Sequence, residues 1–246
     1  MTASAFAPLL LPAYLFAKPG RAPAIGAAVA LQQGVRTAIH AGTLPASAYP
    51  ALHPPASAAP APRLSFRFNG QPDRPRWAQA LLVHFSSRLD EVPLRIEQTT
   101  SLPDLGAPLS AARALSLSLA LNAWCQTPYS PRACARLAQD ALGKTSPPGG
   151  FGVHLQGGML RLSGRSPPRV WPLSAAELRL PIRLSCFGSG ERPAASKPKK
   201  SALLLSRRAA LQANRLFAAH PSLLSLTTAS HHFALQSHPP RFWAAD

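Results

Sequence analysis

The sequence predicts an α+β fold with a mixed sheet, buried helices and a short C-terminal α/β part. First, three extended patterns precede any helical one, at residues 8–16, 25–31 and 35–41. Second, residues 110–124 are apolar nearly all round a helix, which predicts burial on most of its sides. Third, strands and helices do not follow one another in a regular βαβα order, which is the order that predicts a parallel α/β sheet.

Turn residues delimit the N-terminal elements. Lys18, Pro19 and Gly20 predict a turn after the first strand, and Gly42 ends the third. Proline, alanine and serine dominate residues 44–63, which predicts a loop or a semi-rigid linker. Beyond this loop, the spacing of apolar residues predicts a strand at 64–68, a helix at 77–89 and a strand at 94–100.

Two helices follow a loop that ends at residue 109. The first is the apolar segment described above. The second is predicted at residues 131–142, because Ser130 can cap its amino end, Pro131 suits its first position and Gly143 ends it.

The C-terminal third begins with a glycine-rich hairpin. Strand-like residues 151–155 and 159–163 flank Gln-Gly-Gly, which predicts a tight turn at Gly157 and Gly158. Further on, the sequence predicts a strand at 179–186, a mobile basic loop at 188–200, a helix at 202–219 and an extended segment at 223–235. These elements predict an N-terminal domain of residues 1–165 and a smaller C-terminal domain of residues 166–246.

Composition restricts the class of partner. The chain has 246 residues, of which 46% are hydrophobic, so it is long enough to bury a core. Only 14% are charged, and 26 Lys and Arg against 9 Asp and Glu give a net charge of +17. A field of that sign attracts phosphates, nucleic acid, acidic lipid or an acidic protein. Codon bias in a GC-rich genome is an alternative explanation for much of this arginine content.

The cysteines and the N-terminus bear on the compartment. Cys125, Cys134 and Cys186 form no Cys-x-x-Cys pair, which argues against a disulfide framework and a zinc site and favours a reducing cytoplasm. The apolar segment 6–17 is too short to span a bilayer, and no basic residue precedes it as in a secretory signal. We therefore predict a first strand there and no membrane association.

Familiar catalytic motifs are missing. Gly143, Lys144 and Thr145 look like the end of a P-loop, but Ala138 stands where the motif needs glycine, and a helix precedes it. No Gly-x-Ser-x-Gly elbow occurs, and nothing in the sequence supports a pair of carboxylates of the glycosidase type.

Histidines and basic residues near the C-terminus give two weaker alternatives. His231 and His232, with His220 or His238, could bind a metal, but adjacent residues of a strand face opposite sides and no carboxylate is near. The basic run at 197–200 lacks the interleaved aromatics of a single-strand binder, so we predict a solvated loop and no specific nucleic-acid partner.

Residues 101–124, a loop that runs into the buried helix, resemble the second motif of the GHMP superfamily (galactokinase, homoserine kinase, mevalonate kinase and phosphomevalonate kinase). In that motif Pro and a Gly-Leu-Gly-Ser-Ser stretch precede an alanine-rich helix. Small residues there let a phosphate approach the free N–H groups at the amino end of the helix. The resemblance implies a GHMP-kinase-like fold.

Within the superfamily, the order of segments is most similar to that of beta-ribofuranosylaminobenzene 5'-phosphate synthases. Those proteins follow a second helix with a Gly-Arg-x-x-Ser-Gly-Ile-Gly loop, a strand, Gly-Gly and another strand, and residues 143–164 have that order. Residues 23–42 resemble an early Gly-Gly-Ile-Gly-Leu-Ala-Leu segment, and residues 226–237 stand where the family has a Ser/Gly-rich loop and a closing strand.

This resemblance implies an enzyme of tetrahydromethanopterin biosynthesis and one-carbon metabolism. It would be a phosphoribosyltransferase that joins phosphoribosyl pyrophosphate to a hydroxy- or aminobenzoate and releases carbon dioxide and pyrophosphate. Mg²⁺ would accompany the pyrophosphate group. The superfamily's kinases place a catalytic Asp near position 151, and this chain has none there, so kinase activity is not expected. No residue is assigned as catalytic or as a metal ligand, and the residues implied to line the phosphates are Gly106, Ser110, Arg113, Lys144, Thr145, Gly149 and Gly150.

The phosphate loop departs from the family pattern. Asp104, Ala107 and Pro108 stand where Gly, Ser and Gly are expected; Asp104 adds a negative charge and Pro108 removes an N–H donor. These changes support a second hypothesis, a non-catalytic relative that acts as a partner or scaffold subunit in the same pathway. The positive charge would suit an acidic protein partner, and the sequence is also compatible with a homodimer.

Overall fold

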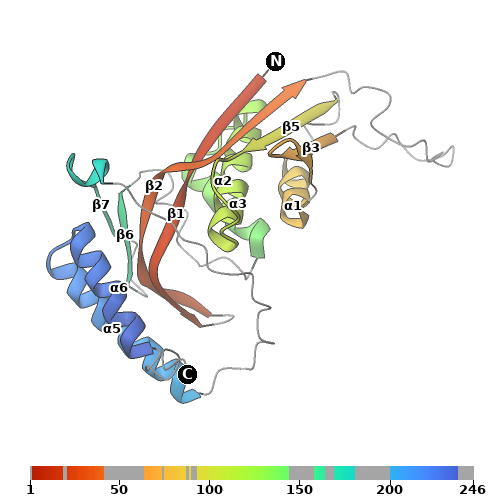
Figure 1. Ribbon diagram of the computed structural model, residues 1–246. Coiled ribbons are helices and arrows are strands. Elements are labelled where there is room, and N and C mark those ends of the chain that lie inside the picture. The colour runs from red at the N-terminus through yellow and green to blue at the C-terminus, as the bar shows by residue number, and fades with distance from the viewer. Residues whose placement is uncertain are drawn as a thin grey trace, which may run out of the picture. The chain divides into compact units, whose positions relative to one another are not determined.

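The computed structural model describes residues 2–18, 21–41, 64–73, 75–86, 89, 93–143, 158–163, 169–180 and 200–237 (Figure 1). The chain forms two compact units. The first unit combines Met1–Leu9 with Gln33–Ser146, and the second combines Leu10–Gln32 with Pro147–Asp246. Two long strands, β1 (Thr2–Lys18) and β2 (Arg21–Ala41), pair with each other and contribute to both units. The domain boundary predicted near residue 165 stays a prediction.

The first unit contains a mixed part of the sheet. The C-terminal part of β2 pairs antiparallel with β5 (Leu94–Thr99), with Ile39 opposite Ile96. β5 pairs in parallel with β3 (Leu64–Phe68), and β3 pairs antiparallel with the short β4 (Gln71–Pro72). Asn69 and Gly70 connect β3 to β4 with positive φ angles of 48° and 79°, as an Asn-Gly hairpin turn requires.

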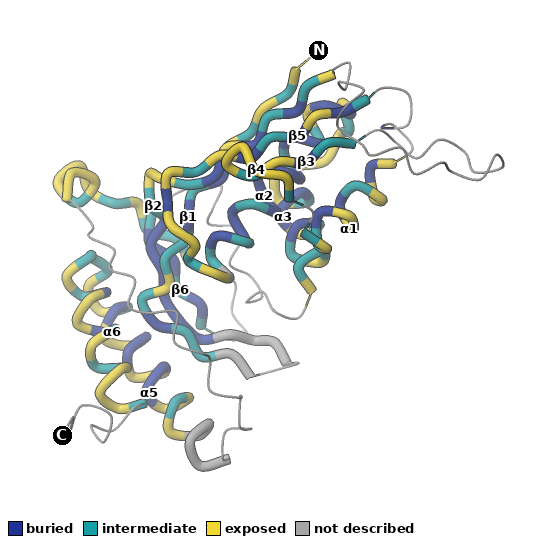
Figure 2. Tube along the Cα trace, turned by 45° about the vertical axis from the view of Figure 1, so that its right-hand side comes forward, coloured by how far each residue is buried: buried dark blue, intermediate teal, exposed yellow. Residues whose placement is uncertain are grey.

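The helices of this unit are α1 (Arg76–Phe85), α2 (Ala107–Trp124) and α3 (Pro131–Leu142). The predicted buried helix is confirmed as α2, and Leu115, Leu117 and Leu121 in it are fully buried (Figure 2). The predicted cap of α3 is also confirmed, because Ser130 Oγ accepts a hydrogen bond from the Ala133 N–H at 3.2 Å. α2 begins three residues before the predicted start, with Pro108 in its first turn, where a missing N–H costs least.

In the second unit, two strands extend the pairing of the N-terminal part of β2. β6 (Met159–Ser163) pairs antiparallel with β2 and with β7 (Arg169–Trp171). The helices α5 (Lys200–Ala219) and α6 (Leu223–Ser237) pack against each other and against this sheet. Tyr14, Met159 and Phe217 lie at the centre of their common core.

The extended segment predicted at residues 223–235 is wrong, because these residues form α6. Leu226, Ala229 and Phe233 recur at helical spacing and pack against the core that contains Tyr14 and Phe217. Threonine, serine and histidine stand between these apolar residues and have low helix propensity. Tertiary packing, and not local propensity, therefore decides that this segment is helical. The place of residues 226–237 in the family pattern, as a loop and a closing strand, is therefore wrong as well.

Two other strand predictions need correction. The strand predicted at 179–186 begins with Arg179, which belongs to the 3-10 turn η4 (Glu177–Arg179), and its residues beyond 180 lie outside the described ones. The separate strands predicted at 25–31 and 35–41 are a single strand, β2. Gly34 lies in the predicted gap and stays in the strand because β1 runs directly against it.

Other predicted segments fall outside the described residues. They are the loop at 44–63, the first strand of the glycine-rich hairpin, the basic loop up to residue 199 and His238. Among the residues that the structure describes, no helix is long and apolar enough to cross a membrane.

Glu177 connects η4 to the amino end of α6. Its Oε1 accepts a hydrogen bond from the Leu223 N–H at 2.8 Å, and its Oε2 accepts from the Ser174 N–H and hydroxyl at 2.9 and 2.7 Å. These bonds favour the ionised carboxylate, so they lower the pKa of Glu177 below its ordinary value, with the Leu223 N–H contributing most.

We expect the Glu177→Gln variant to lose less stability in acid than the wild type. A pKa lowered by folding stabilises the protein above the unfolded-state pKa, and this contribution is lost as pH falls through the folded-state value. The melting temperature of the wild type should therefore fall more steeply between about pH 5 and pH 3 than that of the variant. Circular dichroism melts measure this, with Asp140→Asn on the exposed side of α3 as the control. Equal slopes in the wild type and in Glu177→Gln would contradict the prediction.

Candidate functional site

The amino end of α2 is built on a glycine that no other residue replaces without strain. Gly106 is the N-cap residue, with φ 66° and ψ −125°, a conformation that essentially only glycine adopts. From there the chain turns directly into the helix, and the Ser110 N–H donates to the Gly106 carbonyl at 3.0 Å. Helix geometry leaves the N–H groups of Ala107 and Leu109 without intrahelical acceptors, and Pro108 between them has none to offer. Two backbone donors and the positive end of the helix dipole therefore lie at this end of α2.

Asp104 already uses one donor of the loop. Its Oδ1 accepts a hydrogen bond from the Gly106 N–H at 2.9 Å. This bond fixes the loop before α2, and it also places a carboxylate where an incoming anion would approach. The predicted opposition of Asp104 to anion binding therefore has a geometric basis, because the two compete for the same N–H group.

A pocket of about 350 Å³ opens beside this end of the helix. α2 contributes one wall, and the β3–β4 turn region with the residues before α1 contributes another. Its volume is within the range of small-molecule sites. The residues that line it are Phe68, Gln71, Pro72, Asp73, Asp104, Leu109, Ser110 and Arg113.

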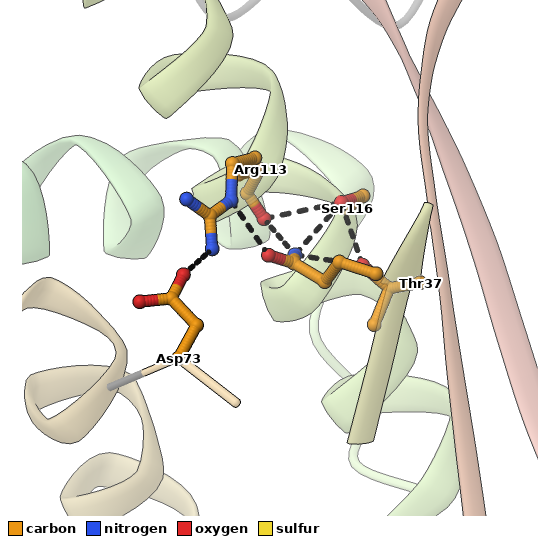
Figure 3. A network of polar contacts seen from close by, with 5 residues as sticks. Thr37, Asp73, Arg113 and Ser116 are labelled. Atoms are coloured by element: carbon orange, nitrogen blue, oxygen red, sulfur yellow. Dashed lines mark hydrogen bonds and ion pairs between the residues drawn. The ribbon is translucent and has the colours of Figure 1, made fainter. Parts of the chain in front are cut away.

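Arg113 is the main cation of the pocket and is held on several sides. Its Nη2 forms an ion pair with Asp73 Oδ2, and its Nε donates to Gln98 Oε1 at 3.0 Å (Figure 3). The guanidinium carbon lies 3.9 Å from the centroid of the Phe68 ring and 5.5 Å from that of Trp77, so it makes cation–π contacts with both rings. Only 12% of the side chain is exposed, so its position is fixed before any ligand arrives.

Gln98 joins Thr37, Arg113 and Ser116 in a polar network, which we call the Gln98 network (Figure 3). Gln98 Nε2 donates to the Arg113 carbonyl at 2.8 Å and to Thr37 Oγ1 at 2.9 Å. The Thr37 and Ser116 hydroxyls lie 2.7 Å apart, and Ser116 also donates to the Arg113 carbonyl at 3.1 Å. Thr37, Gln98 and Ser116 are fully buried, and the network ties β2, β5 and α2 together.

This arrangement is suited to an anion of small size. Ser110 offers a hydroxyl, Arg113 a guanidinium, and the helix end backbone N–H groups, all on or beside one pocket. Their combination is the usual one for phosphate groups. Asp73 and Asp104 oppose it, and each must be displaced or neutralised for a phosphate to bind.

The structure brings together part of the predicted site. Ser110 and Arg113 line the pocket and Gly106 begins the helix beside it. Lys144, Thr145, Gly149 and Gly150 lie outside the described residues.

Sequence reasoning missed Asp73 and Gln98. The Asn-Gly pair at 69–70 predicts the hairpin that carries Asp73 toward α2, so that residue could have been found. Nothing in the alternating pattern of β5 distinguishes Gln98 from an apolar residue at a buried position.

The described residues give no sign of two other chemistries. They contain no group of three or more His, Cys, Asp or Glu placed to hold a metal ion. Within the same residues, the Cys125 and Cys134 thiols are buried and are not joined in a disulfide, and burial raises the pKa of Cys134, so a reactive thiolate is not favoured there.

Known structures resemble the whole chain. A phosphotransferase related to the CoA biosynthesis pathway aligns with 96% of this chain and 76% of its own, with 19% identity and a TM-score of 0.64. Mevalonate kinase from methicillin-resistant Staphylococcus aureus aligns with 93% of this chain and 74% of its own, with 14% identity and a TM-score of 0.59. Mevalonate diphosphate decarboxylase from Staphylococcus aureus aligns with 98% and 74%, with 14% identity and a TM-score of 0.54.

Sequence comparison adds nothing to this likeness. No protein-family model matches the chain, and no curated protein matches it. The solved structures share the GHMP-kinase fold, so the predicted fold class is confirmed. Identities below 20% show that the fold is shared, and they do not show that the activity is shared.

Proposed function

We propose that this GHMP-fold protein binds phosphoribosyl pyrophosphate in the pocket beside α2. It would join the sugar phosphate to a hydroxy- or aminobenzoate, as a beta-ribofuranosylaminobenzene 5'-phosphate synthase does in tetrahydromethanopterin biosynthesis. One observation supports the binding step above all. Ser110 and Arg113 line a pocket of about 350 Å³ at the amino end of an 18-residue helix. The choice of substrate rests on the resemblance in sequence.

In this proposal the pocket holds the diphosphate end of the substrate. The helix end and Arg113 would stabilise the negative charge, which grows on the pyrophosphate as its bond to the anomeric carbon breaks. Ser110 would donate a hydrogen bond to a phosphate oxygen. Because the Gln98 network and the aromatic rings fix Arg113 in advance, little side-chain entropy is lost on binding.

The overall reaction needs no oxidant. Pyrophosphate leaves with the electron pair of the C–O bond at the anomeric carbon. The ring carbon that carries the carboxylate of the benzoate forms the new bond to the anomeric carbon. The carboxylate then leaves as carbon dioxide, and the electron pair of its bond to the ring stays with the ring. We assign only the anion-binding part of this reaction to named residues.

Mg²⁺ fits the pocket only when it is bound together with the diphosphate group of the substrate. One carboxylate oxygen of Asp73 pairs with Arg113, and one carboxylate oxygen of Asp104 accepts from the Gly106 N–H. Each carboxylate has a second oxygen. Magnesium in such sites commonly binds one or two carboxylates together with substrate phosphates. Asp73 and Asp104 are therefore the residues that would hold it, and the ion would screen the repulsion between them and the diphosphate.

We expect Arg113→Lys to weaken binding of phosphoribosyl pyrophosphate about tenfold or more. Lysine keeps the charge but loses the planar fork and the bond to Gln98, so the cation is no longer fixed toward the pocket. Isothermal titration with Mg²⁺ present measures the dissociation constant. Arg95→Lys is the matched control, because Arg95 lies in the same unit with 52% of its side chain exposed. Ribose 5-phosphate serves as a ligand that lacks the diphosphate.

Two results would contradict the proposal. One is the absence of heat with millimolar phosphoribosyl pyrophosphate while circular dichroism shows a folded protein. The other is an equal loss of affinity in Arg113→Lys and Arg95→Lys, which would mean that net charge and not the pocket attracts the ligand.

A second candidate function is a non-catalytic subunit of the same pathway. The observation that favours it is the internal competition in the pocket, because Asp73 pairs with Arg113 and Asp104 holds the Gly106 N–H. In a non-catalytic relative these contacts would replace a ligand and stabilise an empty site. The double variant Asp73→Asn with Asp104→Asn separates the candidates: phosphoribosyl pyrophosphate binding by this variant alone favours the non-catalytic subunit, and binding by the wild type favours the enzyme.

A further inference from the structure

One face of helix α5 is buried in the core of the second unit. Ala209, Ala210, Ala213 and Phe217 are at most 1% exposed. The Tyr14 hydroxyl donates to Asn214 Oδ1 at 2.7 Å, and Asn214 Nδ2 donates to the Leu162 carbonyl at 2.7 Å. Because these contacts set the rotation of the helix about its axis, they also decide which residues face outward.

Much of α5 is exposed (Figure 2), and its exposed residues include leucines and arginines. Arg208 and Arg215 are exposed and stand seven residues apart, so they lie on one line along the helix. Leu211 lies on one side of that line, and Leu205 and Leu216 lie on the other; their exposed fractions are 39%, 53% and 44%. We call Leu205, Arg208, Leu211, Arg215 and Leu216 the α5 surface.

Among the described residues, no carboxylate pairs with the arginines of the α5 surface. Residues 200–237, which include α5 and α6, contain no Asp or Glu. The carboxylate that contacts them, Glu177, is engaged with the Leu223 N–H and with Ser174. An occupant of this surface must therefore bring negative charge, and a second copy of a chain with net charge +17 is disfavoured.

The distribution of leucines favours a protein over a membrane. A helix that inserts into lipid needs one continuous apolar face, with its basic residues on the other. In α5 the continuous apolar face is buried in the core of the second unit. The exposed leucines lie on both sides of the line through Arg208 and Arg215. Arginine surrounded by partly exposed apolar side chains is typical of protein interfaces.

We propose that the α5 surface docks an acidic amphipathic helix of a partner protein. Carboxylates of the partner would pair with Arg208 and Arg215, and its apolar residues would cover the flanking leucines. The inference rests on the second unit alone and does not depend on the phosphate pocket.

A designed peptide tests this proposal with the whole protein. The probe is a fluorescent helical peptide of glutamate and leucine with leucines at helical spacing, and a peptide of the same composition in scrambled order is the reference. Fluorescence polarisation at about 0.15 M ionic strength gives the dissociation constants. We expect the helical peptide to bind about tenfold more tightly than the scrambled one.

Matched variants separate the α5 surface from general attraction. Arg208→Ala with Arg215→Ala should raise the dissociation constant about tenfold, whereas Arg132→Ala with Arg136→Ala, which removes the same charge from exposed positions of α3, should leave it nearly unchanged. Leu211→Gln with Leu216→Gln should also weaken binding, although it keeps the charge.

Four outcomes would overturn the proposal. They are no binding of the helical peptide, no discrimination against the scrambled peptide, equal effects of the two arginine pairs, and no effect of the leucine pair. Vesicles with phosphatidylserine and light scattering test the other occupants. Arginine-dependent binding to vesicles without binding to the peptide would indicate a membrane, and self-association that these variants abolish would indicate a second copy.

Discussion

Replacing Gln98 by leucine will lower the free energy of unfolding by about 3 kcal/mol, because it removes three hydrogen bonds from a buried network and leaves the Arg113 Nε–H without its acceptor. Gln98 is fully buried, and its amide bonds the Arg113 carbonyl, the Thr37 hydroxyl and the Arg113 Nε–H. Leucine fills a similar volume but satisfies none of them. In a chain of this length the melting temperature should fall by roughly 6–12 °C, which scanning calorimetry measures.

Thr99→Leu on the same strand is the matched control. Thr99 is exposed and is the next residue of β5, so leucine there changes strand propensity and surface but leaves the Gln98 network intact. A melting temperature of Gln98→Leu within about 2 °C of that control would show that the network contributes little to stability. The same variant should bind phosphoribosyl pyrophosphate more weakly where it remains folded, since Arg113 loses the group that orients it.

Adding a single methyl group at Gly34 will destabilise the first unit by about 3 kcal/mol or more. A Cβ built on Gly34 overlaps the carbonyl oxygen of Ala7 and comes within 2.6 Å of Pro8 Cα, both backbone atoms that no rotamer change can move away. The strands must separate locally, and the hydrogen bond from the Thr100 hydroxyl to the Gly34 carbonyl, at 2.8 Å, would be disturbed. Denaturation of Gly34→Ala in urea measures the loss.

The neighbouring variant Gln33→Ala isolates this steric effect. Gln33 is exposed in the same strand, so its replacement alters propensity without adding an atom against β1. If Gly34→Ala and Gln33→Ala unfold at the same urea concentration, the close approach of β1 and β2 is not a constraint on this position.

Much of the fold could be predicted because its signals are local. The apolar segment of α2 indicates burial wherever it packs, and the Ser130, Pro131 and Gly143 pattern places both ends of α3. β5 alternates between buried and exposed positions, so its character follows from periodicity alone. The helix α6 could not be predicted in this way. Leu226 and Ala229 form its buried face, and that face is defined only by their packing against Tyr14 and Phe217, which are distant in the sequence.

The candidate site divides in the same manner. Gly106, Ser110 and Arg113 were predicted from the resemblance of residues 101–124 to the GHMP motif, which places an anion at the amino end of a helix. The opposition of Asp104 was predicted, because this residue lies in the motif itself. The Asn-Gly turn indicates where Asp73 lies in the chain, but not its contact with Arg113. Asp73 reaches Arg113 across a sequence separation of 40 residues, and only the parallel pairing of β3 with β5 places it there.

By itself, the sequence determined the α+β class, the buried central helix and the capped α3. These follow from periodicity and from helix-end chemistry, which act within a few residues. The candidate anion site at the start of α2 came from a resemblance to a family motif and stays a prediction. Only the tertiary structure decided that residues 223–237 form a helix, that Gly34 continues a strand and that Asp73 and Gln98 hold Arg113. Each of these depends on burial, steric exclusion or pairing with a distant residue, and such interactions exist only once the chain has folded.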